Sequence, residues 1–393
     1  MNDEYPSRKL LLNSAYYLSD MGFGQLFSEL QAAGYTIIGP RLEQSAIILD
    51  ELQSARDLPA GWGDEQEAGT YRLRRRADQA YFGYNLGPES WKKFLYPRRQ
   101  LLWRAQQSGA GLEFERPVSP PQALAFIGVR ACDLAAIKIQ ARVHQGQELD
   151  PSLNSEVDSS LFMIAVNCAQ AAATCFCTAM TTGPSVDEHG YQYDLALTEF
   201  ADGEDHHFII KGHTTRGLAL LRQLPLQDAD ERAQLAVIRQ HEATARSMTR
   251  QLDLPNASAF FGSRLEHPAW DAIADRCLSC ANCTLVCPTC FCTKVEDTTD
   301  ITGDHAERWL QWDSCFHLDF SHLHGGSVRK STRSRYRQWL THKLGTWFEQ
   351  FGSSGCVGCG RCITWCPVGI DLTAAVIALG KSPGSEATSY AQD

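Results

Sequence analysis

The chain has 393 residues, 44% of them hydrophobic and 21% charged, which is typical of a globular protein with two or three domains. Its formal net charge of -10 argues against nucleic-acid binding, and no stretch is long and apolar enough to span a membrane. With no signal-peptide pattern at the N-terminus, we expect a cytoplasmic protein, whose fifteen cysteines favour metal binding over disulfides.

The N-terminal stretch contains signals for both helices and strands. Residues 21–35 have apolar positions at helical spacing, whereas 36–40 and 45–52 are short apolar runs typical of strands. The segment SWKKFLYPRRQLLWRA, residues 90–105, predicts an amphipathic helix broken at Pro97.

A strand–helix–strand unit is predicted further along the chain. Residues 123–130 and 161–168 are short apolar runs typical of buried strands, and the segment between them has helical spacing. Such a unit makes the two strands parallel, so both end at the same edge of the sheet. We therefore expect residues 1–225 to form an α/β domain with a small parallel or mixed sheet.

Four cysteines follow the ends of these two strands. They should converge at the sheet edge where parallel strands bind ligands. Four thiolates are the number that a 4Fe-4S cluster requires. The alternative is that they are small buried hydrophobic residues, a common role of free cysteine. We favour a cluster held by Cys132, Cys168, Cys175 and Cys177.

The second half is predicted to be a separate unit. Still within the α/β domain, alternating residues and turn signals in 184–212 predict β-hairpins. A polar helix within 226–270 is expected to connect the two halves. Residues 271–380 are expected to form an α+β dicluster ferredoxin-like domain with a long insert. The Gly- and Ser-containing tail, 381–393, is expected to be flexible.

The spacing C-x2-C-x2-C-x3-C-P occurs twice, in residues 277–288 and 356–367. In two-cluster ferredoxins, three cysteines of such a motif bind one 4Fe-4S cluster and the fourth reaches the other cluster. Zinc is the alternative, but a zinc site needs only four ligands and gives no reason for a proline-terminated fourth cysteine in both copies. We assign cluster one to Cys277, Cys280, Cys283 and Cys366, and cluster two to Cys356, Cys359, Cys362 and Cys287.

The insert between the two motifs, residues 289–355, carries a basic run and three further cysteines. The run from Arg329 to Lys343 is either a solvated helix face, which we prefer, or a docking patch or positive field beside an anionic cluster. The other cysteines either pack near the clusters or replace one of the assigned ligands; they are Cys290, Cys292 and Cys315.

The sequence gives no sign of a catalytic centre. There is no glycine-rich nucleotide fingerprint and no spare C-x2-C pair for nickel. We therefore expect no flavin or nucleotide on this chain and no catalytic residues.

Several segments together resemble a known family. They are GVRACDLAAI, IAVNC followed by CFCTAMTTGP, YDLALTE, VCPTCFCTKVED, WDSCF and CVGCGRCITWCPVGID. They look like the iron–sulfur β subunit of cytoplasmic NAD(P)-linked nickel–iron hydrogenases, also called sulfhydrogenases. The corresponding electron-transfer subunit of anaerobic sulfite reductase is similar and belongs to the same wider family. The resemblance covers residues 80–380.

The resemblance implies a non-catalytic electron-transfer subunit. A flavin-containing partner would oxidise NAD(P)H, and this chain would relay single electrons between that partner and the catalytic hydrogenase subunits. The alternative interpretation is an electron-transfer subunit of an anaerobic sulfite reductase. An iron–sulfur redox sensor or scaffold is a third reading, from another class, but a sensor would often carry a DNA-binding element, and none is evident.

Overall fold

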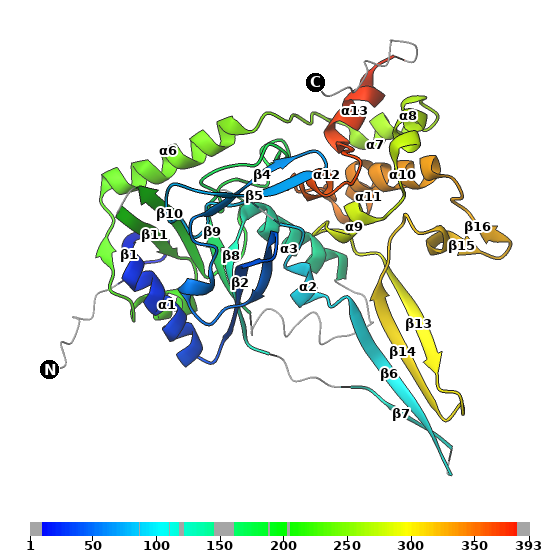
Figure 1. Cartoon of the computed structure of the whole chain (residues 1–393), viewed down its shortest axis with the longest axis horizontal. Helices are drawn as coiled ribbons and strands as arrows, with labels where there is room; N and C mark the ends of the chain where they lie inside the picture. The colour runs from blue at the N-terminus through cyan, green and yellow to red at the C-terminus, as the bar shows by residue number, and fades with distance from the viewer. Residues whose placement is uncertain are drawn as a thin grey trace.

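The computed structural model describes residues 10–85, 87–109, 111–117, 122–144, 161–187, 189–202 and 205–382 (Figure 1). Most of the expected C-terminal tail, residues 383–393, lies outside the described residues. Within the described ranges, no helix is both long and apolar enough to cross a membrane.

An eight-stranded mixed sheet forms the centre of the N-terminal half (Figure 1). The four strands β10, β9, β8 and β2 run parallel, and the strands on either side of them pair antiparallel. In spatial order the strands are β12 (Gln227–Asp228), β1 (Ala15–Ser19), β11 (Asp205–Gly212), β10 (Leu195–Asp202), β9 (Leu161–Val166), β8 (Leu124–Val129), β2 (Thr36–Glu43) and β3 (Ala46–Glu51). The predicted mixed α/β character is confirmed, although the sheet is larger than expected.

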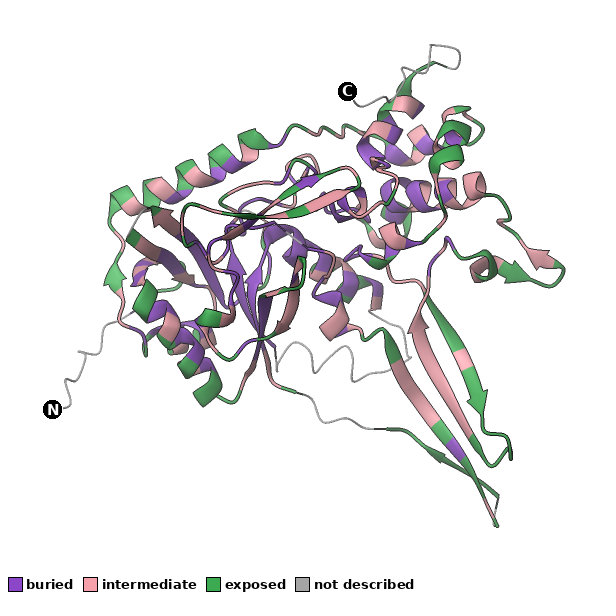
Figure 2. Cartoon of the chain, viewed as in Figure 1, coloured by how far each residue is buried: buried purple, intermediate pink, exposed green. Residues whose placement is uncertain are grey.

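Helices cover both faces of this sheet because its central strands are apolar on both sides. Nearly every residue of β8 and β9 is buried, as in Figure 2, which is typical of strands covered on both faces. Ile127 packs into a core with α1 (Asp20–Ala32) and α5 (Thr215–Leu221), whereas Phe126 packs into a second core with α3 (Ala131–His144). The parallel pairing of β8 with β9 confirms the predicted strand–helix–strand unit.

A four-stranded antiparallel sheet joins distant parts of the chain and projects from the body (Figure 1). Its strands are β13 (Thr293–Thr299), β14 (His305–Trp312), β6 (Arg99–Ser108) and β7 (Gly111–Glu115). The hairpin β13–β14 of the insert thus pairs with the hairpin β6–β7 of the first half.

The helix predicted over residues 90–105 is wrong beyond Pro97. Helix α2 covers only Lys92–Leu95, and the residues after the proline enter strand β6. The apolar residues after Pro97 have helical spacing, but they form a strand because they pair with β14. No pattern within residues 90–105 indicates that distant partner.

Short helices and hairpins make up the rest of the described chain. The predicted connector contains a long polar helix, whose first turn is capped by the carboxylate of Asp230. The segment 184–212 contributes one hairpin, β10–β11. The remaining elements are the hairpins β4 (Trp62–Glu67)–β5 (Thr70–Arg75) and β15 (His322–Leu323)–β16 (Gly326–Ser327), the single turns Ala55–Asp57 and Leu318–Ser321, a π-helical turn at His342–Thr346, and the helices α6 (Glu231–Ser247), α7 (Ala257–Gly262), α8 (Ala269–Arg276), α9 (Asn282–Leu285), α10 (Thr332–Thr341), α11 (Trp347–Phe351), α12 (Arg361–Thr364) and α13 (Leu372–Gly380).

The loop after β9 packs directly on the second cysteine motif. The Phe176 backbone N–H donates to the carbonyl of Gly358 (2.9 Å), and the hydroxyls of Thr174 and Thr364 are 2.8 Å apart. A buried ion pair joins the same regions, since Nη2 of Arg361 lies 2.9 Å from Oδ1 of Asp133 at the start of α3. The two halves therefore meet at the cysteines themselves.

We predict that Gly360→Ala destabilises the protein. Gly360 has φ +75°, and a Cβ there would lie 2.4 Å from the carbonyl oxygen of Thr174. Strain and overpacking together should lower the free energy of unfolding by roughly 2–4 kcal/mol, measured by denaturant unfolding of the full chain. Gly24→Ala in α1 is the matched control, because a Cβ there meets nothing within 4 Å and the change should stabilise by about 0.5–1 kcal/mol. Equal unfolding midpoints for the two variants would contradict the close approach.

Candidate functional site: three groups of cysteines

The first group combines three cysteines of the first motif with the last cysteine of the second. Cys277 ends helix α8, Cys283 lies in α9, and Cys366 follows α12. A single cavity is lined by these three residues together with Cys280, Cys362, Tyr336 and Trp339. The structure thus brings together all four cysteines assigned to cluster one.

The second group is the reciprocal combination. The thiols of Cys287 and Cys359 both lie close enough to Cys362 to interact with it electrostatically, and so does Cys356. Cys287 also interacts with Cys356 and Cys359. The fourth cysteine of the first motif therefore lies with the first three of the second, which are the residues assigned to cluster two.

The third group lies at the carboxyl edge of the large sheet. Cys132 is the second residue of α3, immediately after β8, and Cys168 follows β9. One cavity is lined by Cys132, Cys168, Cys175 and Cys177. The structure therefore brings together the four cysteines predicted for a third cluster. Cys359 of the second motif lines the same cavity, so the third group adjoins the second.

The two ferredoxin motifs share a backbone geometry as well as a spacing. Ser279 and Ala281 of the first have φ values of 51° and 66°, and the equivalent Gly358 and Gly360 have 65° and 75°. In both motifs the residue two positions after the first cysteine donates its backbone N–H to that cysteine's Sγ, at 3.4 Å. The left-handed turns expose backbone N–H groups toward sulfur, as iron–sulfur sites require.

Buried polar groups in the first group fit a cluster there. The Tyr336 hydroxyl and the Trp339 Nε1 have no hydrogen-bond partner among the described residues, although both residues line that cavity. Such orphaned donors are rare in folded proteins and call for an acceptor nearby. The sulfur atoms of a cluster would accept hydrogen bonds from them.

A buried lysine supplies positive charge to the second group. Nζ of Lys343 lies 3.4 Å from Sγ of Cys287 and donates to Oγ1 of Thr289 (2.9 Å) and to the carbonyl of Gly355 (3.0 Å). The Cys290 thiol, by its hydrogen bond, and the Lys343 ammonium hold the pKa of Cys287 well below its usual value. A thiolate is the form that ligates metal.

Burial works against thiolate formation at two other assigned ligands, Cys356 and Cys175. It raises the pKa of Cys356 to about 12 and that of Cys175 to about 12. Burial also opposes the charge of Arg361, but Asp133 and the thiols of Cys359 and Cys132 outweigh it and raise the pKa of that guanidinium. Arg361 thus stays positive between the second and third groups, where its Nε and Nη1 have no partner among the described residues.

The basic run of the insert divides into two sets. Arg333 and Arg337 form ion pairs with the exposed Glu266 on the surface, as the solvated-face interpretation predicts. That interpretation is wrong for Lys343, which is buried beside Cys287, and Arg335 donates to the Ser279 hydroxyl at 3.1 Å in the first motif. The alternative interpretation, a positive field beside the cysteines, describes these two residues.

The sequence analysis missed the ion pair Asp133–Arg361; the only signal was that a basic residue lies inside the second motif. The three further cysteines of the insert lie near the second group, in line with one of their two interpretations: Cys290 contacts Cys287, and Cys292 contacts Cys315. In the described part of the chain, no three His, Cys, Asp or Glu side chains are grouped to hold a single metal ion. The cysteines of the two ferredoxin motifs are likewise not grouped around a single-ion site, because a four-iron cluster would keep their sulfur atoms further apart.

Comparison with known proteins agrees with this geometry. Residues 276–370 match the model of the 4Fe-4S dicluster domain, so the C-terminal region is an iron–sulfur domain of that class. Over 315 residues the chain is 26% identical to sulfhydrogenase 2 subunit beta of Pyrococcus furiosus, an alignment that covers 79% of this chain and 89% of the relative. The predicted resemblance to sulfhydrogenase β subunits is confirmed. No solved structure matches the chain.

We predict that Lys343→Met lowers the reduction potential of the cluster bound beside Cys287. Reduction adds negative charge, which the ammonium stabilises. A unit charge about 5 Å away contributes roughly 3 kcal/mol at an effective dielectric constant of about 20, which is about 130 mV for a one-electron couple. Redox titration followed by electron paramagnetic resonance measures the shift.

The control for this change is Arg337→Met. Arg337 lies in the neighbouring helix α10 and is held by Leu265 and Glu266 at the surface, where its charge is screened. Its removal should shift the potential far less. Equal shifts for the two variants, or none for Lys343→Met, would show that the buried ammonium does not set the potential.

Proposed function

We propose that this chain is the iron–sulfur electron-transfer subunit of a nickel–iron hydrogenase complex. The dicluster domain and the name of its relative support this role. The observation that carries the proposal is the contiguity of the three cysteine groups. Cys362 lines the cavity of the first group and interacts with the second, and Cys359 of the second lines the cavity of the third. Sites that adjoin in this way form a path.

We propose three ligand sets along this path. The geometry that supports them is the crossed sharing of cysteines between the two motifs and the common cavity at the sheet edge. Cluster one is assigned to Cys277, Cys280, Cys283 and Cys366, cluster two to Cys356, Cys359, Cys362 and Cys287, and cluster three to Cys132, Cys168, Cys175 and Cys177.

When bound, such clusters accept and release one electron at a time. The chain's own residues would set the conditions for this. Lys343 and Arg361 place buried positive charge next to the second group, and Arg361 also faces the third. Positive charge and N–H donors near sulfur raise the potential of a cluster, whereas burial without them lowers it.

We propose that hydride chemistry takes place on other subunits. The sequence has no nucleotide fingerprint, so a separate flavin-containing subunit would oxidise NAD(P)H, and separate catalytic subunits would react with hydrogen. The name of the curated relative favours a hydrogenase complex over a sulfite reductase complex.

The third ligand set is tested by its iron content. In the full chain, purified without oxygen, Cys132→Ser and Cys175→Ser should each remove about four irons and leave the spectrum of the dicluster domain intact. Met248→Leu is the matched control, because Met248 lines the same cavity with its Sδ 3.7 Å from Sγ of Cys177 but is not an assigned ligand. Unchanged iron in both cysteine variants would refute the third cluster.

The electron-transfer role is tested on the isolated chain. We expect dithionite to reduce it, and we expect no steady oxidation of NAD(P)H or hydrogen until partner subunits are added. Co-purification from its native source identifies those partners. Stoichiometric flavin in the isolated chain, with steady NAD(P)H turnover, would overturn the proposal.

A further inference from the structure

The five-residue sequence TCFCT occurs twice, at residues 174–178 and 289–293. In both copies the first threonine is fully buried and bonds to the second ferredoxin motif or its immediate flank. The Thr174 hydroxyl is 2.8 Å from that of Thr364, and the Thr289 hydroxyl donates to the carbonyl of Gly355 at 2.5 Å. The first copy supplies two cysteines of the third group. The second copy presents an equivalent pair of thiols at another part of the same motif.

A third thiol joins the second copy at the base of a hairpin. Cys292 immediately precedes β13, and Cys315 lies just beyond the end of β14. The antiparallel pairing of Thr293 with Trp312 brings these ends together. The backbone N–H of Asp313 donates to the carbonyl of Cys292 at 2.8 Å, and the thiols of Cys292 and Cys315 are within hydrogen-bonding contact.

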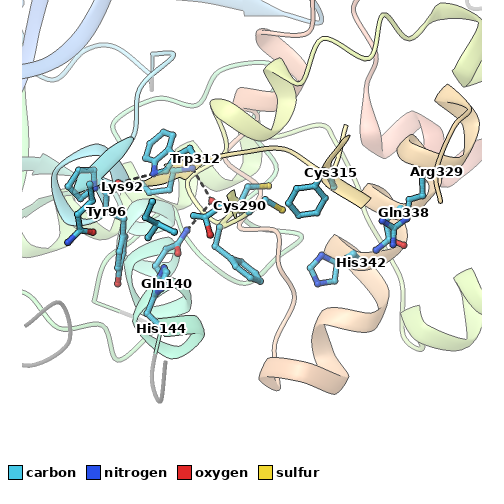
Figure 3. A pocket seen from close by; sticks show the side chains of 17 residues that line it. Lys92, Tyr96, Gln140, His144, Cys290, Trp312, Cys315, Arg329, Gln338 and His342 are labelled. Atoms are coloured by element: carbon cyan, nitrogen blue, oxygen red, sulfur yellow. Dashed lines mark hydrogen bonds between the residues drawn. The ribbon is translucent and has the colours of Figure 1, made fainter. Parts of the chain in front are cut away.

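All three thiols line one cavity, whose volume is about 510 Å³ (Figure 3). This volume lies within the range of about 300–1,000 Å³ that is usual for cofactor sites. Lys92 is buried there, with Nζ 2.9 Å from the carbonyl oxygen of Cys290 and 3.8 Å from the centre of the Trp312 ring. Arg329 and His342 also line the cavity, and no carboxylate is among its described lining residues. The charge therefore suits an anionic group.

We propose that Cys290, Cys292 and Cys315 bind a further iron–sulfur cluster. The contact between Cys290 and Cys287 places this site directly beside the second cysteine group. On binding, Cys290 would lose the proton that it donates to Cys287. Three thiolates would then hold three irons of a four-iron cluster, and the fourth iron would take a ligand other than cysteine. Zinc with three cysteines and one histidine is the alternative, because His342 lines the same cavity, and the metal and sulfide analysis below separates the two. The site would branch the path of clusters toward the projecting four-stranded sheet.

The first test is the iron and acid-labile sulfide content of the full chain, purified and reconstituted without oxygen. Four clusters require about sixteen irons per chain, whereas the two ferredoxin clusters and the third one account for about twelve. Cys315→Ser should lose about four irons and keep the signals that depend on Cys132. Cys290→Ser serves as a second variant if Cys315→Ser does not fold.

The pattern of losses separates this inference from the proposed third cluster. Loss of iron in Cys315→Ser but not in Cys132→Ser sustains the further site and refutes the third cluster. Loss in Cys132→Ser alone, with wild-type iron in Cys315→Ser and Cys290→Ser, overturns the further site. One equivalent of zinc that depends on Cys315, or a Cys292–Cys315 disulfide in the anaerobic protein, also overturns it.

A second readout is specific for a cluster with three cysteine ligands. Ferricyanide should take one electron from it and release one ferrous ion, which leaves a paramagnetic three-iron cluster. We expect this resonance in the wild type and in Cys132→Ser, and its absence in Cys315→Ser. A resonance of equal intensity in Cys315→Ser would assign it to another cluster and contradict the inference.

Discussion

The ion pair between Arg361 and Asp133 is the constraint on which the arrangement of the site depends. Both side chains are almost wholly buried, and Nη2 of Arg361 lies 2.9 Å from Oδ1 of Asp133. Removing two charges from water is costly, and the pair is stable only if both partners are present and correctly placed. Asp133 also accepts a hydrogen bond from Nε1 of Trp91 at 3.2 Å. The pair thereby fixes the start of α3, and with it Cys132, against the second ferredoxin motif.

Close backbone contact between the loop after β9 and the second motif also holds the two cysteine-bearing segments together. A Cβ at Gly358 would lie 2.6 Å from the carbonyl oxygen of Phe176, so only glycine lets the two cysteine-bearing loops approach so closely. The left-handed conformation of this residue serves the cysteine loop as well, because its N–H points to Sγ of Cys356. Gly358 thus shapes the loop that carries Cys356 and also allows the close contact with the loop that carries Cys177.

Local patterns predicted the two cysteine motifs and the strand–helix–strand unit, because each depends on residues near each other in sequence, and the crossed grouping followed from how such motifs bind two clusters. Spacing alone indicated the ferredoxin motifs, and parallel strands indicated that Cys132 and Cys168 share an edge. The pairing of β6 with β14 could not be predicted, since either strand is compatible with many partners. The burial of Lys343 beside Cys287 was not visible either, because a run of basic residues does not indicate which member packs against the cysteines.

The crossed arrangement of the two motifs has a consequence for synthesis of the protein. Cys283 shares its cavity with Cys366, and Cys287 lies with Cys356 and Cys362, so neither group is complete until the second motif has left the ribosome. The cavity at the sheet edge also cannot form before the second motif has been synthesised, because Gly358 and Cys359 form part of its wall. A nascent chain would therefore expose reactive thiols from the synthesis of Cys132 until that of the second motif. Iron supply and protection from oxygen would then matter most in the moments after release, when the halves first meet.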